Sequence, residues 1–293
     1  MHSRWLSLRA WLLMLPLLAV MIAIVGWPLA DTVDLSFTNA RLIGTGGHYV
    51  GIDNYRHILT GSSFWNALKV TAIFAFCSVA IEIVIGVLAA LLLDQQFYGR
   101  TALRALMILP WALPTIVNGT LWRLIYNPEY GALNSLLTQI GLIDSYRSWL
   151  GEPTAALISL IVADAWKNFP LVALIALAAL QAVPRDIKAA AVVDGAGAWA
   201  RFRFVLMPYL AGPLMVALVL RTIEAFKVFD IIWIMTRGGP ANSTRSLSIL
   251  VYQEAFSFQH AGSGASLALI VTLIITVLAA FYIALMQRSA VKA

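Results

Sequence analysis

The sequence predicts an all-α, polytopic membrane protein, and its composition is the first reason. Of the 293 residues, 61% are hydrophobic and 12% are charged, and the mean hydropathy is +0.84. An ordinary soluble domain carries about 25% charged residues, so that class is excluded. The second reason is a series of apolar stretches long enough to cross a bilayer. We expect six transmembrane helices, at Trp11–Ala30, Phe64–Leu93, Ala105–Tyr126, Ala155–Val183, Pro213–Met235 and Gly264–Met286.

The first apolar stretch has two interpretations. It follows Arg4 and Arg9, and this order of charge and hydrophobicity also occurs in a secretory signal peptide. We favour a retained helix within residues 1–30, because the apolar part exceeds a typical signal core and no small-x-small cleavage pattern clearly ends it.

Two spans contain residues that are unusual in lipid. Glu82 lies well inside the second span, where a carboxylate is costly unless it faces other helices or water. It is either a transport-path residue or a packing contact satisfied by a neighbouring helix, and we favour the packing contact. Pro110 and Pro114 are expected to break the third span and give a kink suited to a cavity wall.

The basic residues predict the orientation of the chain, because they are enriched on the cytoplasmic side of membrane proteins. With six spans, one side carries Arg4, Arg9, Arg100, Arg104, Arg185, Lys188, Arg201, Arg203, Arg288 and Lys292. We assign that side, both termini and the tail 287–293 to the cytoplasm, and the loops 31–63, 127–153 and 237–263 to the exterior. This bias explains the net charge of +6 without nucleic-acid binding.

Polar side chains gather in the middle of two spans. The fourth span carries Asp164, Lys167 and Asn168, of which Asp164 and Lys167 can pair along one helix face. The fifth carries Arg221, Glu224, Lys227 and Asp230, three apart and alternating in sign. These groups either line a water-accessible substrate pathway or neutralise one another and fix helix packing. We favour the pathway, with the candidates Asn118, Trp122, Asp164, Trp166, Lys167, Asn168, Arg221, Glu224 and Lys227.

Aromatic residues add a possible stacking surface for sugar rings. Trp122, Trp166 and Phe226 lie within spans, and Trp166 is the best candidate because it is near the middle of its span. Trp233 lies close to a span end, where tryptophan more often anchors a helix at the interface.

The polar segment 184–208 between the fourth and fifth spans has its own predicted structure. Apolar and small residues at helical spacing predict a short helix from Asp186 to Val193, with Asp186 as a cap. Gly195 interrupts it, and a second short helix is expected from Ala198 to Phe204.

This segment carries a resemblance to a known family. P-x-D-I-x-x-A-A-x-V-D-G-A followed by V-x-M-P resembles the cytoplasmic coupling loop in permease subunits of binding-protein-dependent ABC importers. N-P-x-x-G-x-x-N from Asn127, T-R-G-G-P and I-L-V-Y-Q-E-A-F are similar to the sugar-type subfamily. Ala189 stands where that family usually has glutamate, and Met207 where it usually has leucine.

The resemblance implies a type I ABC importer permease fold, with a core of five transmembrane helices over residues 64–286. It implies a multi-pass protein of the bacterial inner membrane that assembles with a second homologous permease, two ATPase subunits and an external solute-binding protein. The solute would be a sugar or a sugar-like, neutral or anionic molecule. The ATPases would bind ATP and magnesium, and this chain no cofactor. By resemblance, the ATPase-coupling residues are Asp186, Ala189, Ala190, Ala191, Asp194, Gly195 and Ala196.

The motifs that are missing from the sequence agree with a transport role. No G-x-x-x-x-G-K-[ST] sequence is present to bind nucleotide phosphates, and the four histidines lack metal-ligand spacing. Cys77 is the only cysteine. Two other classes remain open, a secondary transporter and a membrane-embedded enzyme in which Glu82 converges with Asp164 or Glu224.

Overall fold

The computed structural model describes residues 13–44 and 46–290. In this part of the chain the regular structure is helical, connected by turns and loops, and the β-structure is an isolated bridge between Thr38 and Tyr49. The chain folds as two compact units. The first comprises Met1–Ser62 and Val251–Leu273, and the second comprises Ser63–Leu250 and Ile274–Ala293. Within the described residues, five helices are long and apolar enough to cross a membrane, or six when one bent helix pair counts as a single span. The prediction of an all-α membrane protein is confirmed.

The first helix runs from Leu13 to Ser36 and includes the π-helical turn η1 (Ile22–Gly26) and α2 (Trp27–Ser36). It therefore continues beyond Ala30, where the sequence predicted a loop. Its predicted start at Trp11 lies outside the described residues.

Hydrogen bonds from buried or half-buried side chains hold the first unit together. The unit also contains α3 (Asp53–Thr60) and the first part of α14 (Ala261–Ala290). The hydroxyl of Ser266 donates to the carbonyl of Ser36 at 2.8 Å, and the amide of Asn54 donates to the same carbonyl at 2.9 Å. These bonds satisfy the carbonyl at the end of α2, where helix geometry leaves it without an internal partner.

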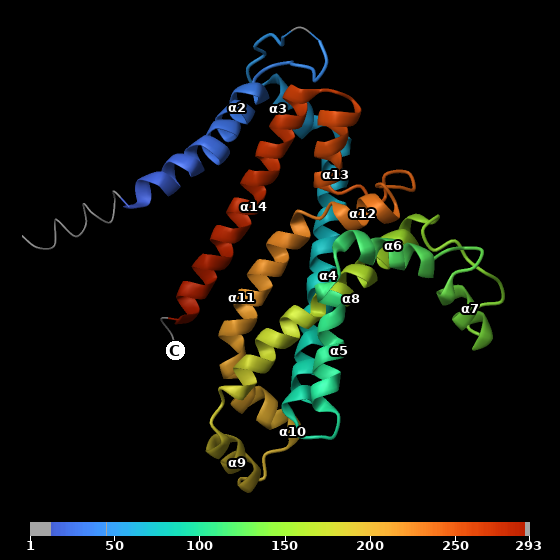
Figure 1. Ribbon diagram of the computed structural model, residues 1–293, viewed down its shortest axis with the longest axis vertical. Coiled ribbons are helices and arrows are strands. Elements are labelled where there is room, and N and C mark those ends of the chain that lie inside the picture. The colour runs from blue at the N-terminus through green and yellow to red at the C-terminus, as the bar shows by residue number, and fades with distance from the viewer. Residues whose placement is uncertain (1–12, 45, 291–293) are drawn as a thin grey trace, which may run out of the picture. The chain divides into compact units, whose positions relative to one another are not determined.

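Three long helices form the body of the second unit, namely α4 (Ser62–Asp94), α8 (Pro153–Gln181) and α11 (Met207–Phe226). One apolar cluster includes Phe74, Leu160 and Ile232, and a second includes Leu93, Leu180 and Leu210. The short helix α9 (Arg185–Val193) lies at one end of this body, and α12 (Asp230–Met235) lies toward the other (Figure 1).

The predicted third span is broken at Pro114, one of the two prolines expected to break it. It consists of α5 (Arg100–Ala112) and α6 (Thr115–Ile125), which meet at an angle of 97°. Leu113 is extended, with φ −70° and ψ 135°, because the ring of Pro114 disfavours helical backbone at the preceding residue. Pro110 is accommodated inside α5.

The predicted fifth span is also wrong at both ends. A continuous helix begins at Ala198, passes through α10 (Ala198–Ala200) and η2 (Arg201–Leu206), and ends at Phe226. The expected second short helix of the polar segment is therefore the beginning of this span. Met235 belongs to α12, which starts after a break at Lys227–Phe229.

The external loops expected from the sequence contain short helices. Besides α3, these are α7 (Ala132–Gln139), α13 (Leu247–Tyr252) and the π-helical turn η3 (Gln253–Ser257). Asn134 on α7 accepts a bond from the indole of Trp149 at 2.8 Å and donates to the carbonyl of Arg147 at 3.0 Å. The segment that follows α7 is thus fastened back onto the helix.

Candidate functional site

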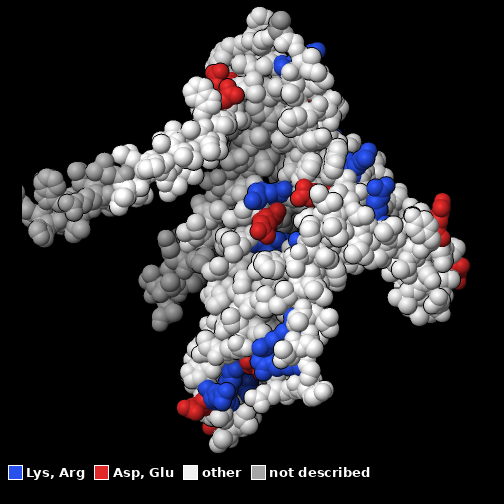
Figure 2. Space-filling view, viewed as in Figure 1, with Lys and Arg blue, Asp and Glu red and all other residues white. Residues whose placement is uncertain are grey.

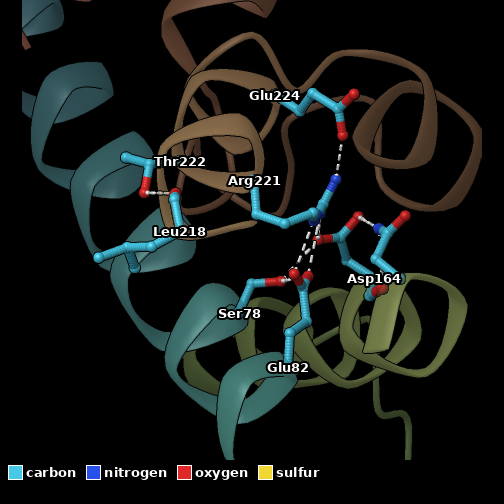
Figure 3. A network of polar contacts seen from close by, with 8 residues as sticks. Ser78, Glu82, Asp164, Leu218, Arg221, Thr222 and Glu224 are labelled. Atoms are coloured by element: carbon cyan, nitrogen blue, oxygen red, sulfur yellow. Dashed lines mark hydrogen bonds and ion pairs between the residues drawn. The ribbon is translucent and has the colours of Figure 1, made fainter. Parts of the chain in front are cut away.

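An arginine at the centre of the second unit holds three carboxylates (Figure 3). The Nε of Arg221 lies 2.6 Å from Oε2 of Glu82, and its Nη2 lies 2.9 Å from Oε1 of the same residue. The Nη2 also lies 3.4 Å from Oδ2 of Asp164, and the Nη1 contacts Glu224. The fork-like contact with Glu82 is the geometry in which an arginine binds a carboxylate most strongly.

These groups come from three helices. Glu82 is on α4, Asp164 on α8, and Arg221 and Glu224 are on α11. The side chain of Glu82 is fully buried and that of Arg221 is 4% exposed, whereas that of Glu224 is 56% exposed. The network therefore extends from the packed interior of the unit toward an open surface.

Neutral groups complete the bonding of the buried carboxylates. The hydroxyl of Ser78 lies 2.5 Å from Oδ2 of Asp164 and 3.1 Å from Oε1 of Glu82. The amide of Asn168 donates to Oδ1 of Asp164 at 2.9 Å. Buried charges are tolerated when they are paired and hydrogen-bonded, and both conditions are met here.

A cavity of about 450 Å³ opens beside this network, and Figure 2 shows acidic and basic atoms together in a hollow of the visible face. Six of its lining residues carry charge, namely Asp164, Lys167, Arg221, Glu224, Lys227 and Asp230. Its other walls include Trp111, Thr115, Asn168 and Phe229. A concave surface with a few convergent polar groups is the usual form of a small-molecule site.

The structure brings together six of the nine predicted pathway residues around this cavity: Asp164, Lys167, Asn168, Arg221, Glu224 and Lys227. Two local details were wrong. Asp164 pairs with Arg221 across helices, and no ion pair joins it to Lys167 in the described part of the chain. The four charges expected on one helix are divided, because α11 ends at Phe226 and Asp230 begins α12.

The remaining three predicted residues do not line the cavity. Asn118 is buried and its amide lies 3.4 Å from the carbonyl of Ala163. Trp122 and Trp166 meet edge to face, with ring centroids 5.7 Å apart. Aromatic pairs of this geometry are stabilising. Trp166 packs on Trp122 and is not in the cavity wall, so it does not offer a stacking surface to a solute in this cavity.

Sequence reasoning missed Trp111 and Phe229 as aromatic walls. Trp111 lies between Pro110 and Pro114, so its place beside the expected break in the third span was the signal that could have identified it. Phe229 was not recognised as a cavity residue because the sequence predicted a continuous fifth helix. Its ring stacks on Trp233 at 5.6 Å and an interplanar angle of 13°.

Glu82 contacts neighbouring helices and is not in the cavity wall, as we favoured from the sequence. It does converge with Asp164 and Glu224, but the guanidinium of Arg221 lies among the three carboxylates. An acid and base pair for catalysis needs carboxylates that are free to exchange protons. The convergence therefore gives an ion network and does not favour an enzyme.

The predicted coupling segment forms α9 and the turn that follows. Ala191 is buried against the unit, while Asp186, Ala189, Ala190 and Asp194 are exposed. Gly195 has φ +73°, a left-handed conformation that favours glycine. Ala196, which comes next, is half-buried.

The cap predicted for α9 was wrong. Pro184 occupies the position before the helix, and no side chain caps the free amides there. Asp186 lies in the first turn instead, where a negative charge is favourable to the helix dipole.

Comparison with known proteins identifies relatives over nearly the whole chain. The family described as "Binding-protein-dependent transport system inner membrane component" matches residues 82–291. The chain is 40% identical over 252 residues to the trehalose/maltose transport system permease protein MalF of Thermococcus litoralis, covering 86% of this chain and 83% of that one. It is 33% identical to the diacetylchitobiose uptake system permease protein DasB of Streptomyces coelicolor, covering 98% and 89%.

Among solved structures, the fold is similar to a chain of a bacterial ABC transporter that imports the acidic polysaccharide alginate. The TM-score is 0.85 at 20% sequence identity, and the match covers 98% of this chain and 99% of that one. At this identity the likeness concerns the fold.

Proposed function

This chain belongs to the family of inner-membrane components of binding-protein-dependent transport systems, and from that premise we propose that it is the permease subunit of an ATP-driven sugar importer. The names of its relatives support the solute class, since they include permeases for trehalose, maltose and diacetylchitobiose. The observation that carries the proposal is the pairing of a charged, half-open cavity in the body of the unit with an exposed coupling helix at its end. The cavity holds the solute and the helix receives the motion.

The ATPase-coupling role of α9 is supported by the surface that it presents. Ile187, Val192 and Val193 are 40%, 55% and 86% exposed, and the small side chains of Ala189 and Ala190 lie exposed between them. Exposed apolar side chains gathered on one short helix favour a protein partner. That partner is one of two ATPase subunits, which bind the ATP and magnesium for which this chain has no phosphate-binding loop.

The same end of the unit is the cytoplasmic side. Basic atoms gather at the end that carries α9 and α10 (Figure 2), and the positive-inside rule favours this orientation. The protein is thus a multi-pass protein of the bacterial inner membrane with both termini inside. A second, homologous permease completes the pathway, and an external binding protein delivers the solute.

The charges of the cavity favour a neutral solute. Its three cationic residues, Lys167, Arg221 and Lys227, are balanced by Asp164, Glu224 and Asp230. Arg221 is occupied by carboxylates, so it is not available to bind an anion. Sugar hydroxyls both donate and accept hydrogen bonds, and they suit a site that presents both signs of charge. An anionic sugar would depend on Lys167 and Lys227 alone.

Reconstitution tests this function. The chain is co-purified with the proposed second permease, ATPase and binding protein, and the complex is placed in proteoliposomes with a labelled disaccharide. We expect uptake that requires both ATP and the binding protein. Uptake by the chain alone, driven by a proton or sodium gradient, would instead identify a secondary transporter.

A further inference from the structure

One lysine on α9 connects the coupling helix to the ends of two long helices. The Nζ of Lys188 lies 2.8 Å from Oδ2 of Asp94, the last residue of α4. The same Nζ lies 3.0 Å from the carbonyl oxygen of Leu180, in the last turn of α8. A cation is favourable at this place because the final carbonyls of a helix have no internal partners and carry the negative end of its dipole.

The same two helices are also joined further along their length. Ser78 on α4 lies 2.5 Å from Asp164 on α8. Eight residues further along each helix, a Cβ at Gly86 would lie 2.7 Å from Val172, so the helices approach more closely than a larger residue would allow. Packed helices of this kind move as rigid elements, because closely packed interiors transmit displacement.

The rise per residue of a helix gives the distance along α4 and α8 between the contacts of Lys188 and the ion network. Asp94 is 12 residues from Glu82 on α4, which corresponds to about 18 Å, and Leu180 is 16 residues from Asp164 on α8, which corresponds to about 24 Å. The carboxylates at the far ends of both paths are the partners of Arg221 on α11. A displacement that Lys188 applies to the ends of α4 and α8 therefore reaches the ion network beside the cavity.

We propose that Lys188 is a positioning residue that fastens the coupling helix to the α4–α8 pair, so that movement of α9 shifts Glu82 and Asp164 relative to Arg221. The proposal rests on the coupling role of α9 given above. The backbone already joins α8 to α9 directly. The Lys188–Asp94 ion pair adds a non-covalent contact between α9 and α4. The side chains of Lys188 and Asp94 are 31% and 23% exposed, so the pair is partly shielded from solvent.

The same contact would also exist if it only stabilised the fold, and the two roles differ in what they change. A purely structural contact affects the amount of assembled complex and lowers uptake and ATP hydrolysis together. A coupling contact changes the number of solute molecules imported per ATP hydrolysed, because the ATPases turn over without moving the helices fully. The ratio is therefore the quantity to measure.

The experiment uses the complete importer in proteoliposomes and measures uptake and ATP hydrolysis in parallel. Lys188→Gln and Asp94→Asn should each lower the import-to-hydrolysis ratio by about two- to fivefold, the range expected for a partly exposed ion pair. The double variant should be no worse than Lys188→Gln alone, because that variant already removes the contact with Asp94. Lys188→Arg should keep the ratio, since arginine reaches the same acceptors. Lys69→Gln, which removes an exposed cation on α4 outside the coupling segment and the cavity wall, is the matched control.

An unchanged ratio in both single variants would overturn the proposal, as would losses that add in the double variant. A proportional loss of uptake and hydrolysis, with the ratio constant, would assign Lys188 a structural role only. Failure of the proposed function is recognised separately, because the wild-type complex would then show no ATP-dependent uptake.

Discussion

Arg221 on α11 binds Glu82 on α4 through two of its nitrogens, at 2.6 and 2.9 Å, and both side chains are almost completely buried. The residues are 139 positions apart in the chain. This contact joins two helices of the second unit at the level of the cavity, and Asp164 adds the third helix. The cavity wall and the packing of the body thus depend on the same ion network.

Removal of Arg221 should destabilise the protein strongly. Arg221→Gln leaves Glu82 and Asp164 buried without their cation, at a cost of about 3–5 kcal/mol. Thermal unfolding of the purified protein in detergent measures the loss. The double variant Arg221→Met with Glu82→Leu should recover part of it, because two apolar residues leave fewer unpaired charges. Equal stability of wild type and Arg221→Gln would contradict this account of the network.

The close approach of α4 and α8 predicts a size limit at Gly86. Gly86→Ala places a methyl group against Val172, and overpacking of this kind costs about 1–3 kcal/mol. Gly212→Ala in α11 is the control, since no atom lies within 4 Å of its added Cβ. That variant should match or exceed wild-type stability, because alanine favours a helix. Equal stability of Gly86→Ala and wild type would contradict this close approach of the two helices.

The balance of charge in the cavity predicts the preferred solute. Lys167→Gln and Lys227→Gln each leave the wall with a net negative charge, so uptake of an anionic sugar should fall more than uptake of a matched neutral sugar. Competition of the two solutes at several ionic strengths measures the difference. Arg221→Ala is not suitable for this test, because loss of the buried ion network would destabilise the fold and lower uptake of both solutes. Equal losses for both solutes would show that the lysines do not sense solute charge.

The exposed position of Ala189 predicts that a larger side chain changes docking and leaves the fold unaffected. Ala189→Glu introduces the carboxylate that the family usually has there, on an exposed face of α9. Its unfolding midpoint should stay close to that of wild type, since exposed substitutions usually change stability by less than about 0.5 kcal/mol. Binding-protein-stimulated ATP hydrolysis is the readout for docking. A large loss of thermal stability would show that position 189 is packed against the chain.

The limits of sequence reasoning are clear at particular residues. Hydrophobic length predicted the long helices, and helical spacing with a glycine stop predicted α9 almost to the residue. The break after Phe226 could not be predicted, because the following residues include neither glycine nor proline. It is stabilised from elsewhere: the hydroxyl of Ser246 donates to the carbonyl of Val228 at 2.9 Å, and Ile231 and Ile232 are buried in the core.

The charged residues of the candidate site could be predicted from the sequence, but their partners could not. Intramembrane charges are costly, so their presence alone pointed to Asp164, Arg221 and Glu224. Their partners depend on which helices are neighbours, and a single sequence does not contain that information. Asp164 and Lys167 were therefore paired by spacing, whereas the structure pairs Asp164 with Arg221, which lies 57 positions away. Trp166 was placed in the pathway by its depth in the span, although its ring packs on Trp122.

The central claim is that α9 lies in the cytoplasm and is held by a separate ATPase subunit. A photo-crosslinking amino acid at position 190, which is exposed on α9, tests it most directly in membranes containing the assembled importer. The account predicts a cross-link to the ATPase subunit whose yield changes when ATP is added. A cross-link to the external binding protein, or none to the ATPase in a complex that imports solute, would contradict it.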